Sequence, residues 1–380
     1  MVVLHIINSL KKGGAEGNLY RLCKFQKSKY KKKIKIVILT LIKNGFYEKE
    51  LKKLGVKIFS LNILEKNNIN NFLKNIVNFR KLLKKINPDI IQSWMYHSNF
   101  FTIFSPIKFY NRIFWNIRHS ELNFEISKKL TIFISYICGF LSWIVPQKII
   151  YCSQKSINFH KNFHFYCNKK TSLVYNGYDH NIYYNSKNLR SKFRIKNRFK
   201  NKETVLGYAG RYAKQKNIKS LLSAFSKLIK KDKNIYLCMV GKNINNQNEE
   251  LLNLVMKFKI RKNVIFLGEQ KNLLEFYNGI DLLVLTSHSE SFPNVLAESM
   301  LCKTPVLSSD AGCAKEIINK SGFILDNNDT FSILKGLKKT LFIMKKKQKW
   351  QLIKKNARPQ IIKNFSIEKT ANRYFENWTL

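Results

Sequence analysis

The sequence predicts an α/β protein with two doubly wound domains, each built on a parallel β-sheet that helices cover on both faces. The chain has 380 residues, which is more than one domain of about 150 residues needs. Its hydrophobic share of 45% excludes wholesale disorder and is enough for two cores. Apolar runs of strand length alternate with segments of helical spacing, and this alternation starts again near residue 204. Such an order of segments is typical of parallel sheets.

The first half of the chain reads as successive strand–helix–strand units. Residues 2–7 are continuously apolar, as in a strand buried on both faces, and Gly13 and Gly14 separate them from a segment of helical spacing. Pro88 ends a predicted helix and leads into the next strand. Further strands are expected at residues 34–40, 56–61, 88–94 and 149–153, and a helix at about 70–85.

The second half repeats the same alternation. Strands are expected at residues 205–209, 235–240, 264–267, 282–285, 305–308 and 323–325, and a helix at about 218–230. The boundary is expected between residues 178 and 202, where the composition turns to Asn, Tyr and alternating basic residues. We therefore divide the chain into domains 1–183 and 184–362, followed by a C-terminal helix, 363–380, that packs back on the first domain.

Two segments of the first domain raise the question of a membrane. Residues 130–146 are apolar for about seventeen positions, fewer than the ~20 that a spanning helix needs, so we expect a buried or interfacial helix. Residues 100–118 mix aromatic rings with Lys108, Arg112 and Arg118. One helical face there is expected to hold cations at headgroup depth above the rings, and the alternative is a helix that only covers the sheet.

The net charge of +46, from 69 basic and 23 acidic residues, favours a polyanionic partner. Nucleic acid, an anionic membrane surface and a phosphorylated substrate all fit, and a compositional bias of the genome is the alternative. The seven cysteines form no Cys-x-x-Cys pair and no zinc spacing, which predicts a reducing cytoplasm and no metal site. The start of the chain does not resemble a signal peptide. Neither Gly-Lys-[Ser/Thr] nor Gly-x-Gly-x-x-Gly follows the first strand, which argues against NTPases and dinucleotide enzymes.

Residues 287–312, SHSESFPNVLAESMLCKTPVLSSDAG, form the most informative segment. They begin at the carboxyl end of one expected strand, where open α/β sheets bind ligands. If a helix starts near Pro293, Glu290 lies on the loop before it and Glu298 lies in its first turns, so that both carboxylates can face one cleft. The free amides at this helix start would serve as donors to anions or hydroxyl groups, and they belong to Phe292, Asn294 and Val295.

This segment resembles the E-x7-E signature of glycosyltransferase family 4, whose members are retaining transferases of the GT-B fold. Further matches stand in order along nearly the whole chain, at Gly13-Gly14-Ala15-Glu16, Asn176-Gly177, Gly210-Arg211 with Lys216, and Phe266-Leu267-Gly268. The resemblance implies two Rossmann-like domains that face a central cleft. Domain 1–183 would bind the acceptor, and domain 184–362 would bind the nucleotide-sugar donor.

The resemblance also implies roles for single residues. Arg211 and Lys216 match the pair that holds the donor diphosphate, and fixed cations suit a leaving group on which negative charge grows. Glu298 matches the glutamate that binds the ribose hydroxyls, Glu290 the one near the 3- and 4-hydroxyls of the sugar, and His119 the histidine near its reacting carbon. The predicted catalytic residues are His119, Glu290, Arg211 and Lys216. The predicted donor-binding residues are Gly14, Gly210, Arg211, Lys216, Glu290, Phe292, Pro293, Asn294, Val295 and Glu298.

Acceptor contacts are predicted for Gly13, His97 and Arg118. Gly13 lies where the backbone can approach a phosphate at a helix start. His97 follows an expected strand, and Arg118 would bind an acceptor phosphate. A purely structural role is the alternative for each histidine.

The predicted activity is retaining, metal-independent transfer of a hexose or N-acetylhexosamine from a nucleotide sugar, UDP-linked, to a lipid-linked saccharide. No cofactor is expected, and the enzyme would lie in the cytoplasm, peripheral on the inner face of the cell membrane. Departures from the family pattern leave the donor sugar open, and they stand at Gly17, Ser291, Lys303 and Cys313. The alternatives are a basic nucleic-acid-binding protein, for which no RRM, KH, helix-turn-helix or zinc-finger pattern is present, and a GT-B sugar-nucleotide epimerase.

Overall fold

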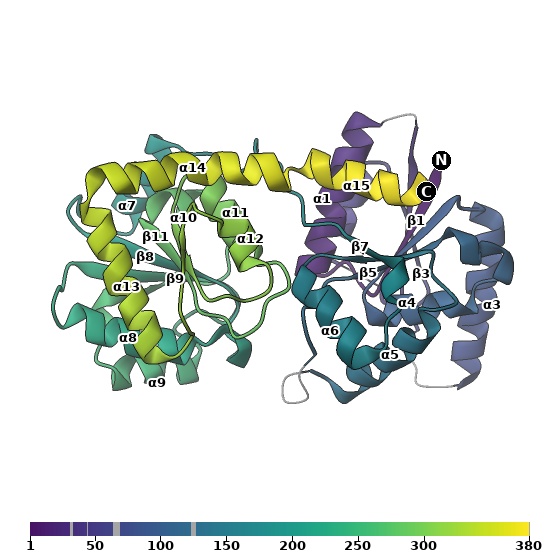
Figure 1. Ribbon diagram of the computed structural model, residues 1–380, viewed down its shortest axis with the longest axis horizontal. Coiled ribbons are helices and arrows are strands. Elements are labelled where there is room, and N and C mark those ends of the chain that lie inside the picture. Colours follow the sequence, from purple (N-terminus) through teal and green to yellow (C-terminus); the bar gives the residue numbers. More distant parts are fainter. Residues whose placement is uncertain (31–32, 44, 64–68, 123–126, 380) are drawn as a thin grey trace. The chain divides into compact units, whose positions relative to one another are not determined.

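The computed structural model describes residues 1–30, 33–43, 45–63, 69–122 and 127–379. The chain divides into two compact units, shown in Figure 1. Unit 1 comprises Met1–Gly177 and Ile367–Leu380, and unit 2 comprises Tyr178–Ser366. The boundaries expected from sequence were 183/184 and 362/363. The chain therefore enters unit 2 and returns to unit 1 within a few residues of the expected positions.

Unit 1 contains a seven-stranded parallel sheet of order β3-β2-β1-β4-β5-β6-β7. Its strands are β1 (Val2–Ile7), β2 (Lys35–Thr40), β3 (Lys57–Ser60), β4 (Ile90–Trp94), β5 (Ile113–Ile117), β6 (Lys148–Tyr151) and β7 (Thr171–Leu173). Its α-helices are α1 (Gly14–Lys29), α2 (Glu48–Lys53), α3 (Ile69–Ile86), α4 (Tyr96–Phe101), α5 (Lys129–Leu141), α6 (Gln154–His164) and α15 (Ile367–Thr379).

Unit 2 contains a six-stranded parallel sheet of order β10-β9-β8-β11-β12-β13. Its strands are β8 (Thr204–Ala209), β9 (Ile235–Val240), β10 (Val264–Phe266), β11 (Leu282–Leu285), β12 (Val306–Ser308) and β13 (Phe323–Ile324). Its α-helices are α7 (Lys187–Lys196), α8 (Ile218–Ile229), α9 (Glu249–Lys257), α10 (Leu274–Gly279), α11 (Asn294–Leu301), α12 (Ala314–Ile318), α13 (Thr330–Lys345) and α14 (Lys347–Phe365).

The continuous apolar strands are explained by burial on both faces of each sheet. Along β1, Leu4 and Ile6 pack in one hydrophobic cluster, whereas Val3 and Ile7 pack in another. Successive side chains of a strand point to opposite faces, so both faces are covered. This confirms the predicted sheets with helices on both sides.

The last helix, α15, belongs to unit 1 and packs on α1. Tyr374 and Trp378 are buried in the unit 1 core. The Tyr374 hydroxyl accepts a hydrogen bond from Asn116 Nδ2 at 2.6 Å, and Trp378 Nε1 donates to Gln92 Oε1 at 3.0 Å. These bonds tie the end of the chain to the middle of the first sheet.

The amphipathic helix expected over residues 100–118 is wrong. The segment holds the end of α4, two short 3₁₀ helices, Thr102–Phe104 and Ile107–Arg112, and then β5. Phe109 of the second 3₁₀ helix is buried, and so are Phe114 and Trp115 of β5, because a strand covered on both faces takes successive aromatic rings into the core. These three rings are therefore unavailable to a membrane.

The apolar segment 130–146 contains α5, which has thirteen residues. No helix in the described part of the chain combines the length and the apolarity needed to cross a membrane.

Candidate functional site

Both sheets reverse their strand order next to their first strand, between β1 and β4 in unit 1 and between β8 and β11 in unit 2. Open α/β sheets bind ligands outside the carboxyl ends of the strands at such a switch point. Gly210 and Lys216 follow β8, and Glu290 follows β11. The predicted donor residues of unit 2 therefore surround the switch point of their sheet.

Lys216 and Glu290 form an ion pair between Nζ and Oε1, although they are 74 positions apart. Their side chains are only 15% and 13% exposed. Ser287 donates its hydroxyl to the same carboxylate oxygen at 2.8 Å. The attraction between two charges shielded from water is stronger than between the same charges in water. The structure thus brings together, in one ion pair, two of the four predicted catalytic residues.

Hydrogen bonds to the backbone also hold together the two loops that carry this ion pair, which follow β8 and β11. The His288 N–H donates to the carbonyl oxygen of Gln215 at 2.8 Å, and the Thr286 hydroxyl donates to that of Lys216 at 3.3 Å. On the other side, Asn217 Nδ2 donates to the Asn328 carbonyl oxygen at 2.6 Å. The positions of Lys216 and Glu290 are thus fixed by main chain as well as by their own charges.

Arg211 lies on the loop after β8 with an exposed side chain. Beneath the loop, the buried Tyr208 donates its hydroxyl to the Arg211 carbonyl oxygen at 3.3 Å. Burial raises the pKa of Tyr208, the charge of Glu290 raises it further, and Arg211 opposes this. Tyr208 is therefore a neutral support for the loop, and the Arg211 side chain extends into solvent.

Glu298 lies in α11 and is buried. Its Oε2 accepts a hydrogen bond from the Tyr277 hydroxyl at 2.8 Å. Burial raises the pKa of Tyr277 well above its ordinary value, and the carboxylate of Glu298 raises it further. The two glutamates of the motif thus have different partners, a cation for Glu290 and a neutral phenol for Glu298.

The start of α11 is built from the predicted amide donors. Phe292 and Pro293 are buried, and the Phe292 ring packs on Tyr178 and Phe365, with centroids 6.0 and 5.7 Å apart. The Tyr178 hydroxyl donates to Asn294 Oδ1, and the neighbouring Val295 is half-buried. These contacts fix the helix start, and the role of its amides stays a prediction.

Two glycines that were not among the candidates shape the site. Gly312 has a φ of 61°, and a Cβ there would lie 2.3 Å from the carbonyl oxygen of Glu290. Gly241 has a φ of 145°, and its Cβ would lie 2.1 Å from the carbonyl oxygen of Gly210. Each glycine lets a neighbouring chain pass against a candidate loop. Their positions just after expected strands were the available signal.

In unit 1, Gly13 and Gly14 begin α1 after β1, with Gly13 at the N-cap. The Glu16 carboxylate folds over Gly13, where an added Cβ would lie 2.3 Å from Glu16 Oε2. Burial raises the pKa of Glu16. The roles of Gly13 in acceptor binding and of Gly14 in donor binding stay predictions.

The two candidate histidines follow neighbouring strands of the unit 1 sheet. His97 lies in α4 just after β4, and His119 is exposed just after β5. The ring of Tyr96 lies 5.7 Å from that of His119, and the Ser156 hydroxyl donates to the His119 carbonyl oxygen. Burial lowers the pKa of His97, and the charge of Lys128 lowers it further. The His97 imidazole is therefore neutral at pH 7.

Arg118 requires a correction, because it is buried and engaged within unit 1. Its guanidinium donates to Asn116 Oδ1 at 2.7 Å and to Val174 O and Asn176 Oδ1 at 2.9 Å, and also to the Tyr374 hydroxyl. These bonds join α15 to the sheet. Arg118 is thus a structural residue, and the predicted contact with an acceptor phosphate is not kept.

All seven cysteines are buried thiols without a disulfide. Among the described residues, no group of three or more His, Cys, Asp or Glu side chains is arranged to hold a metal ion.

Comparison with known proteins follows the same division of the chain. Residues 190–358 match the family model described as glycosyl transferases group 1. One relative, N-acetyl-alpha-D-glucosaminyl L-malate synthase of Bacillus anthracis, is 26% identical over 54% of this chain. That match spans 53% of the relative, so the alignment covers about half of its length.

Two other relatives match over more of their length. The capsular polysaccharide biosynthesis glycosyltransferase CapH of Staphylococcus aureus is 26% identical over 81% of each chain. The N,N'-diacetylbacillosaminyl-diphospho-undecaprenol alpha-1,3-N-acetylgalactosaminyltransferase of Campylobacter jejuni is 24% identical, over 74% of this chain and 75% of its own.

The crystal structure of Anabaena HepE in complex with UDP is similar over the whole of both chains, with a TM-score of 0.84 and 20% identity. This likeness confirms the predicted fold class, two Rossmann-like domains of the GT-B kind. The cleft expected between them stays a prediction. Residues 190–358, which the glycosyl transferases group 1 model matches, make up most of unit 2.

Proposed function

We propose that this protein is a glycosyltransferase that moves a hexose or N-acetylhexosamine from a UDP-sugar to a lipid-linked saccharide. The observation that carries the proposal is the shielded pair of Lys216 and Glu290 at the switch point of a group 1 domain. The names of the Bacillus and Campylobacter relatives support an N-acetylhexosamine, and the UDP of the HepE structure supports the nucleotide.

In the proposed mechanism, Lys216 and Arg211 bind the donor diphosphate. As the sugar leaves, negative charge grows on the diphosphate, and two fixed cations stabilise this charge. The exposed Arg211 side chain can move to the donor, whereas Lys216 is already held by Glu290. These cations would supply the charge that a metal ion supplies in other transferases, so the reaction is proposed to need neither metal nor cofactor.

Glu290 and Glu298 would recognise hydroxyl groups of the donor. An ionised carboxylate accepts two hydrogen bonds from vicinal hydroxyls. Glu290, held by Lys216 and Ser287, would bind the sugar, and Glu298, held by Tyr277, would bind the ribose. His119 would lie near the reacting carbon, and the acceptor hydroxyl would attack from the face that the diphosphate leaves, which retains the anomeric configuration.

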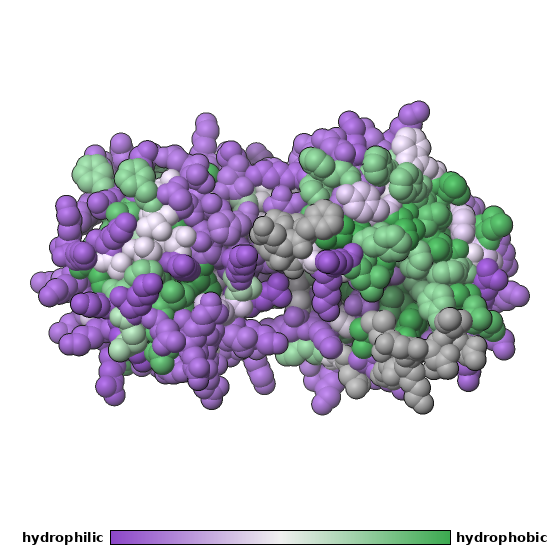
Figure 2. All heavy atoms as spheres, turned by 90° about the horizontal axis from the view of Figure 1, so that it is seen from below, coloured by the Kyte–Doolittle hydropathy of each residue, from purple (hydrophilic) through white to green (hydrophobic). Residues whose placement is uncertain are grey.

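A lipid-linked acceptor requires a route to a membrane surface, and unit 1 offers one. Seven large apolar side chains of α5, α6 and the turns after them are 52–71% exposed. We call this set the α5–α6 surface, and its members are Leu130, Phe133, Phe140, Trp143, Ile144, Phe163 and Phe165. Figure 2 shows hydrophobic residues gathered on unit 1, on the side where α5 and α6 lie in Figure 1.

Basic side chains accompany this surface. Lys129 and Lys161 are exposed on the same helices, and Lys170 Nζ donates to the Trp143 carbonyl oxygen at 2.8 Å. Aromatic rings beside lysines suit the headgroup region of an anionic leaflet. The acceptor is therefore proposed to carry a diphosphate-linked lipid, like that in the name of the Campylobacter relative, and the enzyme to lie on the inner face of the cell membrane.

Binding of sugar nucleotides to the full chain tests the proposal. UDP-N-acetylglucosamine, UDP-N-acetylgalactosamine and UDP-glucose should raise the melting temperature to different degrees, because a ligand of the folded state stabilises it by mass action. In Glu298→Gln, the shift should be lost while the melting temperature without ligand stays close to wild type, since Tyr277 can still donate to the amide oxygen. An unchanged shift in this variant would remove Glu298 from the donor site.

A further inference from the structure

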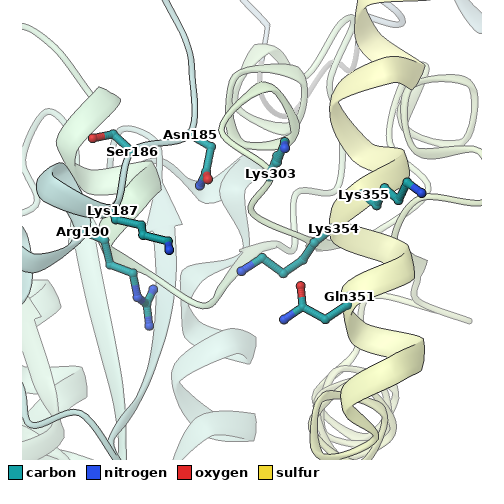
Figure 3. Close-up of a pocket in the computed structure, with 8 residues that line it drawn as sticks. All are labelled: Asn185, Ser186, Lys187, Arg190, Lys303, Gln351, Lys354 and Lys355. Atoms are coloured by element: carbon teal, nitrogen blue, oxygen red, sulfur yellow. The ribbon is translucent and has the colours of Figure 1, made fainter.

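Unit 2 contains a charged cavity that the proposed function does not use. Its volume is about 420 Å³, and its lining comes from α7 and the two residues before it, from the turn after α11 and from α14. Five of its lining residues are cations, and the others are neutral and polar. The cations are Lys187, Arg190, Lys303, Lys354 and Lys355. Figure 3 shows Lys187 of α7 and Lys354 of α14 extending toward each other.

The cavity lies at the opposite edge of the sheet from the candidate donor site. Arg190 is bound to Asp281, which immediately precedes β11, and Lys303 stands shortly before β12. Both positions mark the amino ends of strands. Glu290 and Lys216 instead follow the carboxyl ends of β11 and β8. In a parallel sheet these ends form two different edges, so a ligand of this cavity is a separate ligand.

The positive charge in the cavity is poorly compensated. Arg190 Nη2 pairs with Asp281 Oδ1 at 2.6 Å, and the other oxygen of Asp281 accepts from the Val205 N–H at 2.8 Å. In the described part of the chain, Arg190 is the one cavity cation that forms an ion pair with a carboxylate. Burial lowers the pKa of Lys354, the charges of Arg190 and Lys303 lower it further, and the charge of Asp281 opposes this only in part. Several like charges are therefore held together, which an anion would relieve.

The backbone of Lys303 adopts a conformation that is unfavourable for a residue other than glycine. Its φ of 59° lies in the left-handed region that favours glycine. The turn is fixed by two bonds, from the Lys303 N–H to the Met300 carbonyl oxygen at 3.0 Å and from the Thr304 N–H to that of Ser299 at 3.1 Å. The lysine side chain is thus presented to the cavity from a defined turn.

The chemistry of the lining residues limits the classes of ligand that the cavity can bind. Lysine ammonium groups bind phosphate as point charges, and an arginine held by a carboxylate keeps its direction. No apolar or aromatic side chain is among the residues that line the cavity, so it offers no surface for a nucleobase or a lipid chain. We propose that the cavity binds a compact polyphosphate anion of the inorganic pyrophosphate class, at a site separate from the donor site.

Calorimetric titration of the full chain with inorganic pyrophosphate, at constant ionic strength and with saturating UDP, tests this proposal. UDP is included so that the candidate donor site is filled before pyrophosphate is added. Wild type should bind one equivalent of pyrophosphate. Lys303→Gln/Lys354→Gln should bind it at least about tenfold more weakly, since two charge-assisted contacts are lost.

The matched control is Lys338→Gln/Lys339→Gln, which removes the same charge from exposed positions of α13. Its affinity for pyrophosphate should stay within about twofold of wild type. Equal weakening in both double variants would overturn the proposal, because only the overall charge would then matter. Pyrophosphate binding that UDP abolishes would also overturn it, by assigning the anion to the donor site.

The single variant Lys303→Gln, at an exposed position, keeps the test decisive if the double variant does not fold. It should weaken pyrophosphate binding by several-fold, and unchanged affinity would contradict the proposal. If UDP itself does not bind, the proposed donor is wrong, but the dependence of pyrophosphate binding on Lys303 still decides this inference.

Discussion

The two units share one strand order around their switch points but place different chemistry there. In unit 2, the loops after β8 and β11 meet through the charges of Lys216 and Glu290. In unit 1, the corresponding segments after β1 and β4 carry Gly13 at the start of α1 and a neutral His97 in α4. The sheet thus decides where a ligand can bind, and a few loop residues decide which ligand.

The interiors and surfaces of the units differ in the same sense. Unit 1 buries His5 and His160 and exposes the apolar α5–α6 surface, whereas unit 2 lines its charged cavity with five cations. His160 is fixed within a neutral network, since its Nδ1 lies 2.7 Å from the Ser156 carbonyl oxygen and its Nε2 lies 2.7 Å from the Tyr96 hydroxyl. Unit 1 is therefore suited to apolar surroundings and unit 2 to anions.

The largest expected difference between the two units is in acid, where unit 1 should lose stability before unit 2. Burial lowers the pKa of both His5 and His160 to about 3, against an ordinary value of 6.5. Between these values the unfolded chain binds more protons than the folded one, so stability is present above pH 6.5 and is lost as the pH falls toward 3. The loss should be on the order of several kcal/mol, and urea unfolding at pH 7 and pH 4.5, with hydrogen exchange resolved by peptide, measures it.

The control for the acid effect is an exposed histidine of unit 2. His160→Gln should flatten the dependence of stability on pH, whereas His288→Gln, at an exposed position, should not. Unfolding of unit 2 before unit 1 in acid would contradict the contrast between the two interiors.

The charges at the unit 2 switch point should matter most for catalysis. Lys216→Ala should lower the rate of transfer by roughly 10²-fold or more, the scale expected when a preorganised stabiliser of developing charge is removed. Lys219→Ala removes an equal charge from an exposed position of α8 and should leave the rate nearly unchanged. Equal rates for the two variants in steady-state kinetics with a UDP-sugar would move the diphosphate site elsewhere.

The regular parts of this fold could be predicted from sequence because the apolar strands are unambiguous. Residues 2–7, 235–240 and 282–285 coincide with β1, β9 and β11. The region in which the boundary was expected, 178–202, begins where unit 2 begins but also contains α7. The many basic residues of this region concealed a helix whose Phe193 is buried. The composition reflects the charged residues, whereas the helix is held in place by the burial of a few side chains.

The candidate site was predictable to a similar extent. The E-x7-E spacing located Glu290 and Glu298, but sequence separation cannot show that Lys216 pairs with one and Tyr277 with the other. Gly312 was missed because its need for a positive φ depends on a chain segment 22 positions away. Contacts between distant loops are set by tertiary packing, which a local pattern does not encode.

The bonds of the buried Arg118 are expected to contribute to the stability of unit 1. Arg118→Ala should lower the free energy of unfolding by about 2–4 kcal/mol, because it leaves buried acceptors such as Asn116 and Asn176 without their charged donor. Arg373→Ala on α15 breaks only an exposed pair with Glu376 and should change stability little. Urea unfolding measures both variants. A stable Arg118→Ala protein with reduced acceptor affinity would restore the role predicted from sequence.

The smallest expected effect concerns the α5–α6 surface and its contact with lipid. Phe133→Ser/Phe140→Ser removes two rings that are each 62% exposed, so the fold should persist, while binding to vesicles that contain phosphatidylglycerol should weaken about tenfold. The matched control, Phe331→Ser/Phe342→Ser, removes rings of unit 2 that are 74% and 61% exposed and should bind as wild type does. Because the lysines near the surface act through screened charge, the binding that remains in the first variant should also fade as salt rises. Flotation at low and high salt separates the two contributions. An equal loss of vesicle binding in both double variants would show that exposed rings of either unit contribute to binding. The α5–α6 surface of unit 1 would then have no special role at the membrane.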